Sequence, residues 1–205
     1  MHIDKIKINN FKNYISATIY FDDKINFLYG KNGAGKTNLL DAIYYLSYGK
    51  SIVNNLDTEN IKHSESFFTI EGSYSNNYLY KCTFQIPNRK KIYENGNKYK
   101  NLKEHIGKIP VVFVNPYDIN LIRNYSNNRR RFFDQIFSQI DKKYLDSLIA
   151  YNRLIKQRNA YLKNLLSIND IDSNHIKSYD DKLITLNKYI GKKRKEEVKS
   201  FNSIF

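Results

Sequence analysis

The feature that most constrains this chain is the octapeptide GKNGAGKT at Gly30–Thr37. The apolar run INFLY at 25–29 comes before it and predicts a short buried strand. Apolar residues follow from 38 to 48 at the spacing of one helix face, and Gly49 is suited to end that helix. The pattern G-x-x-x-x-G-K-[ST] between a strand and a helix is typical of a loop that binds phosphate groups.

The residue types in this loop match the chemistry of a nucleoside triphosphate. Glycines lack a Cβ, so the backbone can curl and point its N–H groups at phosphate oxygens. A lysine at this position neutralises the β- and γ-phosphates, and the threonine hydroxyl coordinates Mg²⁺. We therefore predict bound ATP and Mg²⁺, with Thr37 as the metal ligand. The predicted cofactor site is Gly30, Lys31, Asn32, Gly33, Ala34, Gly35, Lys36 and Thr37. The alternative is a glycine-rich turn that caps a helix and binds nothing.

Composition narrows the class of partner and the compartment. The 205 residues carry 34 Lys+Arg against 20 Asp+Glu, a net charge of +14. Such an excess favours a polyanion such as nucleic acid, or an anionic membrane, although an A/T-biased genome would also enrich lysine. Cys82 is the only cysteine, which excludes an intrachain disulfide and suits the cytoplasm. The longest apolar runs are too short to span a bilayer, so we expect no membrane partner.

The pattern of apolar residues divides the chain into two parts. Up to residue 125 it predicts an α/β lobe, with an antiparallel strand meander at 67–99 and a buried strand at 109–116. The turn signal Asn95-Gly96 lies within that meander. From 126 to 205 the spacing predicts a basic, helical lobe. Its helices are expected at 126–140, 143–163 and from 175 onward.

Several segments, in order, resemble the RecF family of bacterial recombination and repair proteins. They are KIKINNFKNY at the N-terminus, the P-loop with its following helix and GKS, VFVNPYDINLI, RRRFFD at 129–134 and QRN at 157–159. The match runs from about residue 1 to 163. Ile52 and Val53 depart from the Phe-Arg that the family usually has after its Gly-Arg-Ser.

The resemblance implies a P-loop NTPase of the ABC type, like the heads of RecF and SMC proteins. It implies ATP-dependent binding of single-stranded or gapped DNA in replication, recombinational repair and the SOS response. The implied partners are recombination mediator proteins, and the complete protein would form an ATP-dependent homodimer. The family's signature motif and Walker B carboxylates are expected in a C-terminal part outside this chain. Catalytic residues are therefore not identified here, and turnover by the chain alone stays open.

Two other functions are weighed against this one. A nucleotide-binding remnant without ATP turnover is the main alternative, because no apolar strand ending in a carboxylate follows the P-loop. An ATPase subunit of a membrane transporter is less favoured, because RRRFFD, QRN and the helical lobe do not suit it.

The basic residues outside the loop have competing interpretations. Arg129, Arg130 and Arg131 are candidate DNA contacts, but Arg130 or Arg131 could instead pair with Asp134 along the helix. The run KKRK at 192–195 is expected to be a solvated helix face, with DNA contact as the alternative.

Residues near the first strand also have two readings. Phe11 and Tyr14 either stack on adenine or belong to the core, and core is favoured. Lys12 is a further candidate for reaching the nucleotide.

Overall fold

The computed structural model describes residues 1–75, 77–87, 89–118, 126–164 and 172–202. The chain divides into two compact units, Met1–Phe113 and Val114–Phe205. The predicted boundary near residue 125 lies outside the described residues, so its position stays a prediction.

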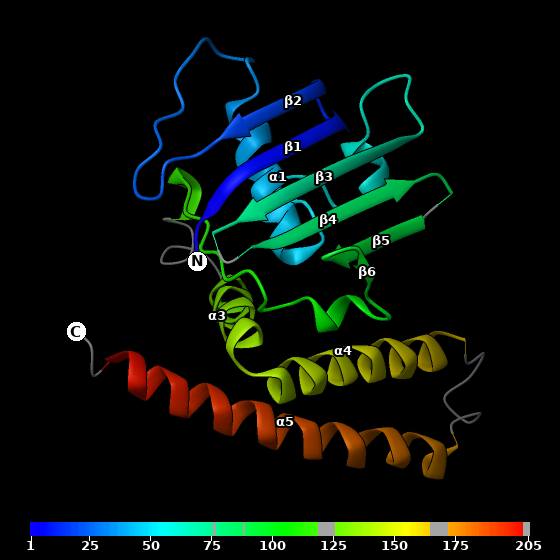
Figure 1. The fold of residues 1–205 in the computed structure, drawn as a ribbon. Helices are drawn as coiled ribbons and strands as arrows, with labels where there is room; N and C mark the ends of the chain where they lie inside the picture. Colours follow the sequence, from blue (N-terminus) through cyan, green and yellow to red (C-terminus); the bar gives the residue numbers. More distant parts are fainter. Residues whose placement is uncertain (76, 88, 119–125, 165–171, 203–205) are drawn as a thin grey trace. The chain divides into compact units, whose positions relative to one another are not determined.

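The first unit contains a six-stranded antiparallel sheet (Figure 1). Its strand order is β2-β1-β3-β4-β5-β6. The strands are β1 Ile3–Phe11, β2 Tyr14–Tyr20, β3 Phe67–Tyr74, β4 Tyr78–Gln85, β5 Arg89–Glu94 and β6 Asn97–Lys98. The predicted meander is confirmed, and Asn95 and Gly96 both adopt the left-handed conformation that a two-residue hairpin requires.

Helix α1 (Lys36–Tyr48) covers one face of this sheet, which we call the inner face. Alternation in each strand directs every second side chain toward α1, so the strands contribute a continuous apolar layer. Phe11, Tyr45 and Phe68 meet edge to face, with ring centroids 5.1 to 6.0 Å apart. The core comprises Ile6, Ile8, Phe11, Leu39, Ala42, Tyr45, Leu46, Phe68, Ile70, Tyr74, Tyr80, Cys82, Phe84, Ile92 and Ile109.

Two predicted strands are wrong. Neither 25–29 nor 109–116 forms a strand, and neither lies in a ladder with a described strand. The side chain of Phe27 is 84% exposed and that of Val114 is 76% exposed. An apolar run forms a buried strand only where neighbouring strands satisfy its backbone groups. The described sheet gives these two segments no such neighbour.

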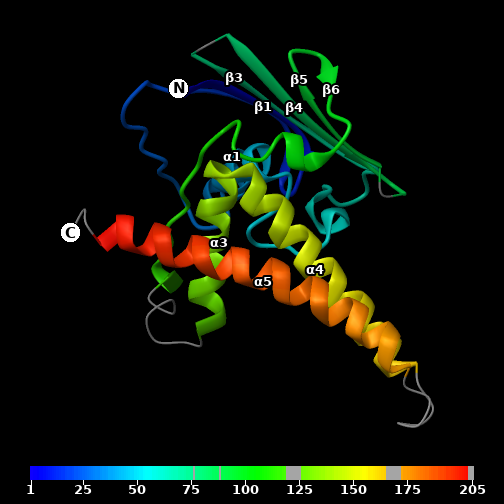
Figure 2. The ribbon, with the colours of Figure 1, turned by 90° about the horizontal axis from the view of Figure 1, so that it is seen from below.

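The second unit is helical, as predicted. It contains the short helix η3 (Pro116–Asp118), α3 (Ser126–Ile140), α4 (Lys142–Lys163) and α5 (Ser173–Asn202). Helices α4 and α5 lie side by side in both views (Figures 1 and 2). Asp141 caps α4 by accepting a hydrogen bond from the Tyr144 N–H. Within the described part of the chain, no helix is both long and apolar enough to cross a membrane.

A polar cluster joins these helices around Asp134. The Arg194 guanidinium binds its carboxylate through two nitrogens, at 2.8 and 2.9 Å, and the Tyr144 hydroxyl also donates to it. Asp134 does pair with an arginine, but the partner is Arg194 and not the predicted Arg130 or Arg131. Helical spacing permits an i+4 pair, but the packing of α5 brings in an arginine 60 residues later.

A buried histidine, His105, follows the short helix η2 (Leu102–Glu104) and packs against α1. His105 is fully buried, between the rings of Tyr80 and Tyr99. Its Nε2 donates to the Leu46 carbonyl, and among the described residues its Nδ1 has no partner. Burial lowers the pKa of His105, because a charged imidazolium would lose its hydration there.

This histidine predicts a loss of stability in mild acid. As the pH falls below about 6.5, the unfolded chain takes up a proton that the folded chain resists. The free energy of unfolding should therefore decrease between about pH 7 and pH 5, as urea titrations at each pH would measure. His105→Phe should flatten this dependence, whereas substitution of the exposed His63 by Gln should leave it unchanged. An unchanged slope in His105→Phe would contradict the assignment.

Candidate nucleotide site

The loop at Gly30–Thr37 has a backbone that depends on its glycines. Gly30, Gly33 and Gly35 have φ values of 147°, 82° and 101°, in the region that favours glycine. Helix α1 begins at Lys36, and Leu39 N–H donates to the Gly35 carbonyl at 2.9 Å. The first N–H groups of α1 have no partner within the helix, and they lie at its positive end, next to the loop.

The two side chains with predicted ligand roles lie in the first turn of α1. The Lys36 ammonium curls back over the loop and donates to the carbonyls of Gly30 and Lys31, at 2.7 and 2.9 Å. Thr37 is exposed, and its hydroxyl makes no hydrogen bond to any described residue. The structure thus brings an ammonium, a hydroxyl and a glycine-rich backbone to one helix end.

The turn between β1 and β2 supports the end of the loop. The Tyr14 hydroxyl donates to the Gly35 carbonyl at 3.2 Å, and Asn13 Oδ1 accepts from the Asn38 side chain at 2.8 Å. Gly35 has a φ of 101°, where any residue with a Cβ is strained, and that Cβ would also lie 2.7 Å from Asn13 Nδ2. Phe11 is core, as favoured, but Tyr14 has the additional role of holding the loop. The sequence pattern predicts Tyr14 as a stacking or core residue and gives no signal for its hydrogen bond to the loop.

A buried ion pair fixes α1 to the same turn. Lys12 Nζ lies 2.5 Å from Asp41 Oδ2, and Asp41 is fully buried. The same carboxylate accepts from the Ser51 hydroxyl and from the Ile52 N–H, both at 2.7 Å. Lys12 is a candidate for reaching the nucleotide, but in the structure its ammonium binds Asp41. Its observed role is to tie the β1–β2 turn to α1 and to the segment that follows it.

The arginines at 129–131 lie in the exposed first turns of α3, in the second unit. The Arg130 guanidinium donates to the Asn127 side chain at 2.6 Å. In the run 192–195, Lys193 pairs with Asp141 at 3.1 Å and Arg194 with Asp134, so half of this run is structural. The expectation of a solvated face at 192–195 therefore holds for Lys192 and Lys195, whereas Lys193 and Arg194 are half-buried and paired.

Acidic and metal-ligating groups add little to the site. No cluster of three or more His, Cys, Asp or Glu side chains suited to a metal occurs in the described ranges. Asp118, which follows the run at 109–116, accepts from Asn115 through both carboxylate oxygens. Asp41, the acidic residue of α1, is engaged as described above. The described geometry therefore supports binding of an anion, and it identifies no general base.

The ion pair predicts a stability effect at Asp41. Asp41→Asn leaves the Lys12 ammonium without a buried counter-charge, and breaking such a pair costs roughly 3–5 kcal/mol. We expect a decrease of about that size in the free energy of unfolding, measured by urea titration. Glu71→Gln provides a control, because Glu71 lies 3.9 Å from two half-exposed lysines and should cost under about 1 kcal/mol. Equal effects for the two variants would contradict this role of Asp41.

Comparisons with known proteins agree with the fold and extend along the whole chain. A family model described as an AAA domain matches residues 5–204. The DNA replication and repair protein RecF of Flavobacterium johnsoniae is 42% identical over 208 residues, which cover all of this chain and 58% of that protein. RecF of Cytophaga hutchinsonii is also 42% identical, over 55% of its length. The chain thus spans little more than half the length of these relatives.

Solved structures give the same result. A structure of the recombination mediator protein RecF with ATP, in the RecFOR pathway, has a TM-score of 0.88 and 30% identity. The match covers 96% of this chain and 54% of that one. An SMC head bound to a winged-helix domain of ScpA has a TM-score of 0.55 at 20% identity, which supports the fold alone.

These matches confirm the resemblance and the fold class that the sequence predicts. The chain is similar to RecF over that protein's N-terminal part, and its fold is that of the RecF and SMC heads. From its match over residues 5–204, the chain belongs to the AAA domain family.

Proposed function

We propose that this chain is the nucleotide-binding part of a RecF-like protein that binds DNA in an ATP-dependent way. Its role would be in replication, recombinational repair and the SOS response. The observation that carries the proposal is the Gly30–Thr37 loop at the start of α1, with its left-handed glycines and its lysine and threonine. The RecF relatives support the choice of DNA repair among the many functions that P-loop proteins serve.

The loop would hold the phosphates of ATP through three kinds of contact. Backbone N–H groups from Gly33 to Thr37 would donate to phosphate oxygens, favoured by the positive end of α1. Lys36 would exchange its two carbonyl partners for the β- and γ-phosphates, since an anion is the stronger acceptor. The exposed Thr37 hydroxyl is suited to a place in the coordination shell of Mg²⁺, which would neutralise phosphate charge when bound.

The partners follow from the resemblance. DNA with single-stranded or gapped regions is the proposed substrate, and recombination mediator proteins are the proposed protein partners. An ATP-dependent homodimer is proposed for the complete protein, in the cytoplasm. The transporter alternative receives no support from the relatives, which are named as replication and repair proteins.

The second candidate function is nucleotide binding without turnover by residues 1–205. It is favoured by the engagement of Asp41 with Lys12, Ser51 and Ile52, which leaves this carboxylate unsuited to activate water. The test of this second candidate measures phosphate release from ATP by the purified chain, with and without DNA. Release above the level of Lys36→Ala would exclude the remnant.

Nucleotide binding should depend on Lys36. Lys36→Ala removes the charged donor to the phosphates, and hydrogen bonds to charged groups contribute about 1.5–3 kcal/mol each. We expect Mg-ATP affinity to fall at least about tenfold in isothermal titration. Lys24→Ala, at an exposed lysine outside the loop, should bind as the unsubstituted chain does. Unchanged affinity in Lys36→Ala would overturn the assignment of the loop.

The arginines at 129–131 should contribute to DNA affinity in a salt-dependent way. Replacing all three by Gln should weaken binding of a gapped oligonucleotide at low salt, measured by fluorescence anisotropy. The slope of log affinity against log salt should become shallower by about 0.7–0.9 for each lost phosphate contact. The control replaces the exposed lysines 177, 182 and 188 of α5 by Gln, with the same loss of charge. Equal effects in both variants would assign no specific role to the arginines.

A further inference from the structure

The face of the sheet turned away from α1, which we call the outer face, is polar and basic. Alternation places the buried residues Phe68, Cys82 and Phe84 against α1, so the residues between them point outward. The strand register aligns these outward residues in rows that run across β3, β4 and β5. The rows are Phe67–Gln85–Arg89, Thr69–Thr83–Lys91 and Glu71–Lys81–Tyr93.

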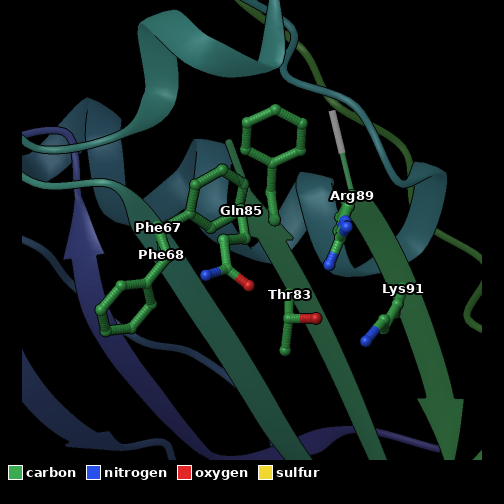
Figure 3. A pocket seen from close by; sticks show the side chains of 7 residues that line it. Phe67, Phe68, Thr83, Gln85, Arg89 and Lys91 are labelled. Atoms are coloured by element: carbon green, nitrogen blue, oxygen red, sulfur yellow. The ribbon is translucent and has the colours of Figure 1, made fainter. Parts of the chain in front are cut away.

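Five residues of the first two rows line a hollow of about 270 Å³, to which the inward-facing Phe68 and Phe84 also contribute (Figure 3). Phe67 and Gln85 belong to the first row, and Thr83 belongs to the second. The two cations, Arg89 and Lys91, both come from β5. At about 30 Å³ per water, the hollow holds the volume of roughly nine water molecules, which is more than enough for one nucleobase.

The two cations at the hollow lack the partners that other lysines of the sheet have. Lys90 lies between them in sequence and points the other way, where it binds Asp57 at 2.6 Å and the Gly49 carbonyl at 2.7 Å. Lys81 lies 3.9 Å from Glu71. Within the described structure, the side chains of Arg89 and Lys91 have neither an ion pair nor a hydrogen bond. The hollow therefore carries two positive charges without a carboxylate beside them.

The remaining groups at the hollow are of the kinds that proteins use to contact a nucleobase. Phe67 is 39% exposed, so part of an aromatic ring is available beside the hollow. An exposed aromatic ring next to cations is the usual platform for an unpaired base. Gln85 lies between Phe67 and Arg89, and its amide both donates and accepts, as does the Thr83 hydroxyl.

We propose that this hollow binds one nucleotide of single-stranded DNA. The base stacks on Phe67 and meets the polar groups of Gln85 and Thr83, while the backbone follows β5. Arg89 and Lys91 are two residues apart on one side of β5, about 6.8 Å along the strand, and contact successive phosphates. A paired duplex has no free base to offer Phe67, so the site selects single strands. The proposal rests on the proposed function, since it gives DNA binding a site distinct from the arginines at 129–131.

The test measures the binding of fluorescein-labelled oligo(dT) and of a blunt duplex by anisotropy. Arg89→Gln with Lys91→Gln should weaken oligo(dT) binding more than the matched charge loss of Lys177→Gln with Lys182→Gln. Phe67→Ala should weaken oligo(dT) binding at least about fivefold, with little change for the duplex. Phe67→Tyr keeps the ring and should restore binding. Circular dichroism establishes that each variant is folded.

A second measurement uses the unsubstituted chain, so it is independent of how the variants fold. An oligonucleotide with 5-iodouracil is photo-crosslinked to the chain, and the attached peptide is identified by mass spectrometry. Attachment to the peptide that contains Phe67 supports the site.

The remaining outcomes overturn the proposal in distinguishable ways. Equal losses in the hollow and control variants, with attachment elsewhere, overturn the site but leave DNA binding by the chain intact. Loss of duplex and single-strand binding together, with no effect of Phe67→Ala, overturns the single-strand selectivity. No binding of either DNA by the unsubstituted chain overturns the proposed function as well.

Discussion

The packing of α1 on the inner face of the sheet is the interaction on which the rest of the first unit depends. Fully burying a large apolar side chain contributes about 1.5–3 kcal/mol, and Phe11, Tyr45 and Phe68 form the centre of this contact. Because α1 is fixed there, its first turn is fixed as well. The glycine-rich loop at Gly30–Gly35 is therefore anchored at its C-terminal end, where it joins the packed helix α1.

Polar contacts further fix the position of α1 and of the loop before it. The Lys12–Asp41 pair joins the β1–β2 turn to α1, and the Tyr14 hydroxyl reaches the Gly35 carbonyl from the same turn. One short turn therefore controls both the helix and the loop before it. A change at Asp41 should act on the nucleotide site without touching it, which separates a supporting role from a binding role.

The two faces of the sheet have different tasks. The inner face holds α1, and its lysine at position 90 is neutralised by Asp57. The outer face presents Arg89 and Lys91 on the same strand with no such partner among the described residues. Period-two alternation thus divides one basic run, RKK at 89–91, into a structural charge and two charges available to a ligand.

The sequence by itself determined much of the fold. The P-loop pattern, the helix at 36–48, the meander and the three long helices all follow from local spacing and turn residues, which act over a few positions. The same local rules failed for 25–29 and 109–116, because an apolar run becomes a strand only beside a suitable neighbour. These local rules also do not predict ion pairs between residues far apart in the sequence, such as Arg194 with Asp134 and Lys12 with Asp41.

Only the tertiary structure decided which charges are engaged and which are free. The sequence does not distinguish paired from unpaired cations within KKRK at 192–195 or RKK at 89–91. The packing of α5 commits Lys193 and Arg194 to carboxylates, and the register of β4 and β5 turns Arg89 and Lys91 toward the hollow. The physical reason is that an ion pair depends on distance in space, which chain order does not specify for residues far apart.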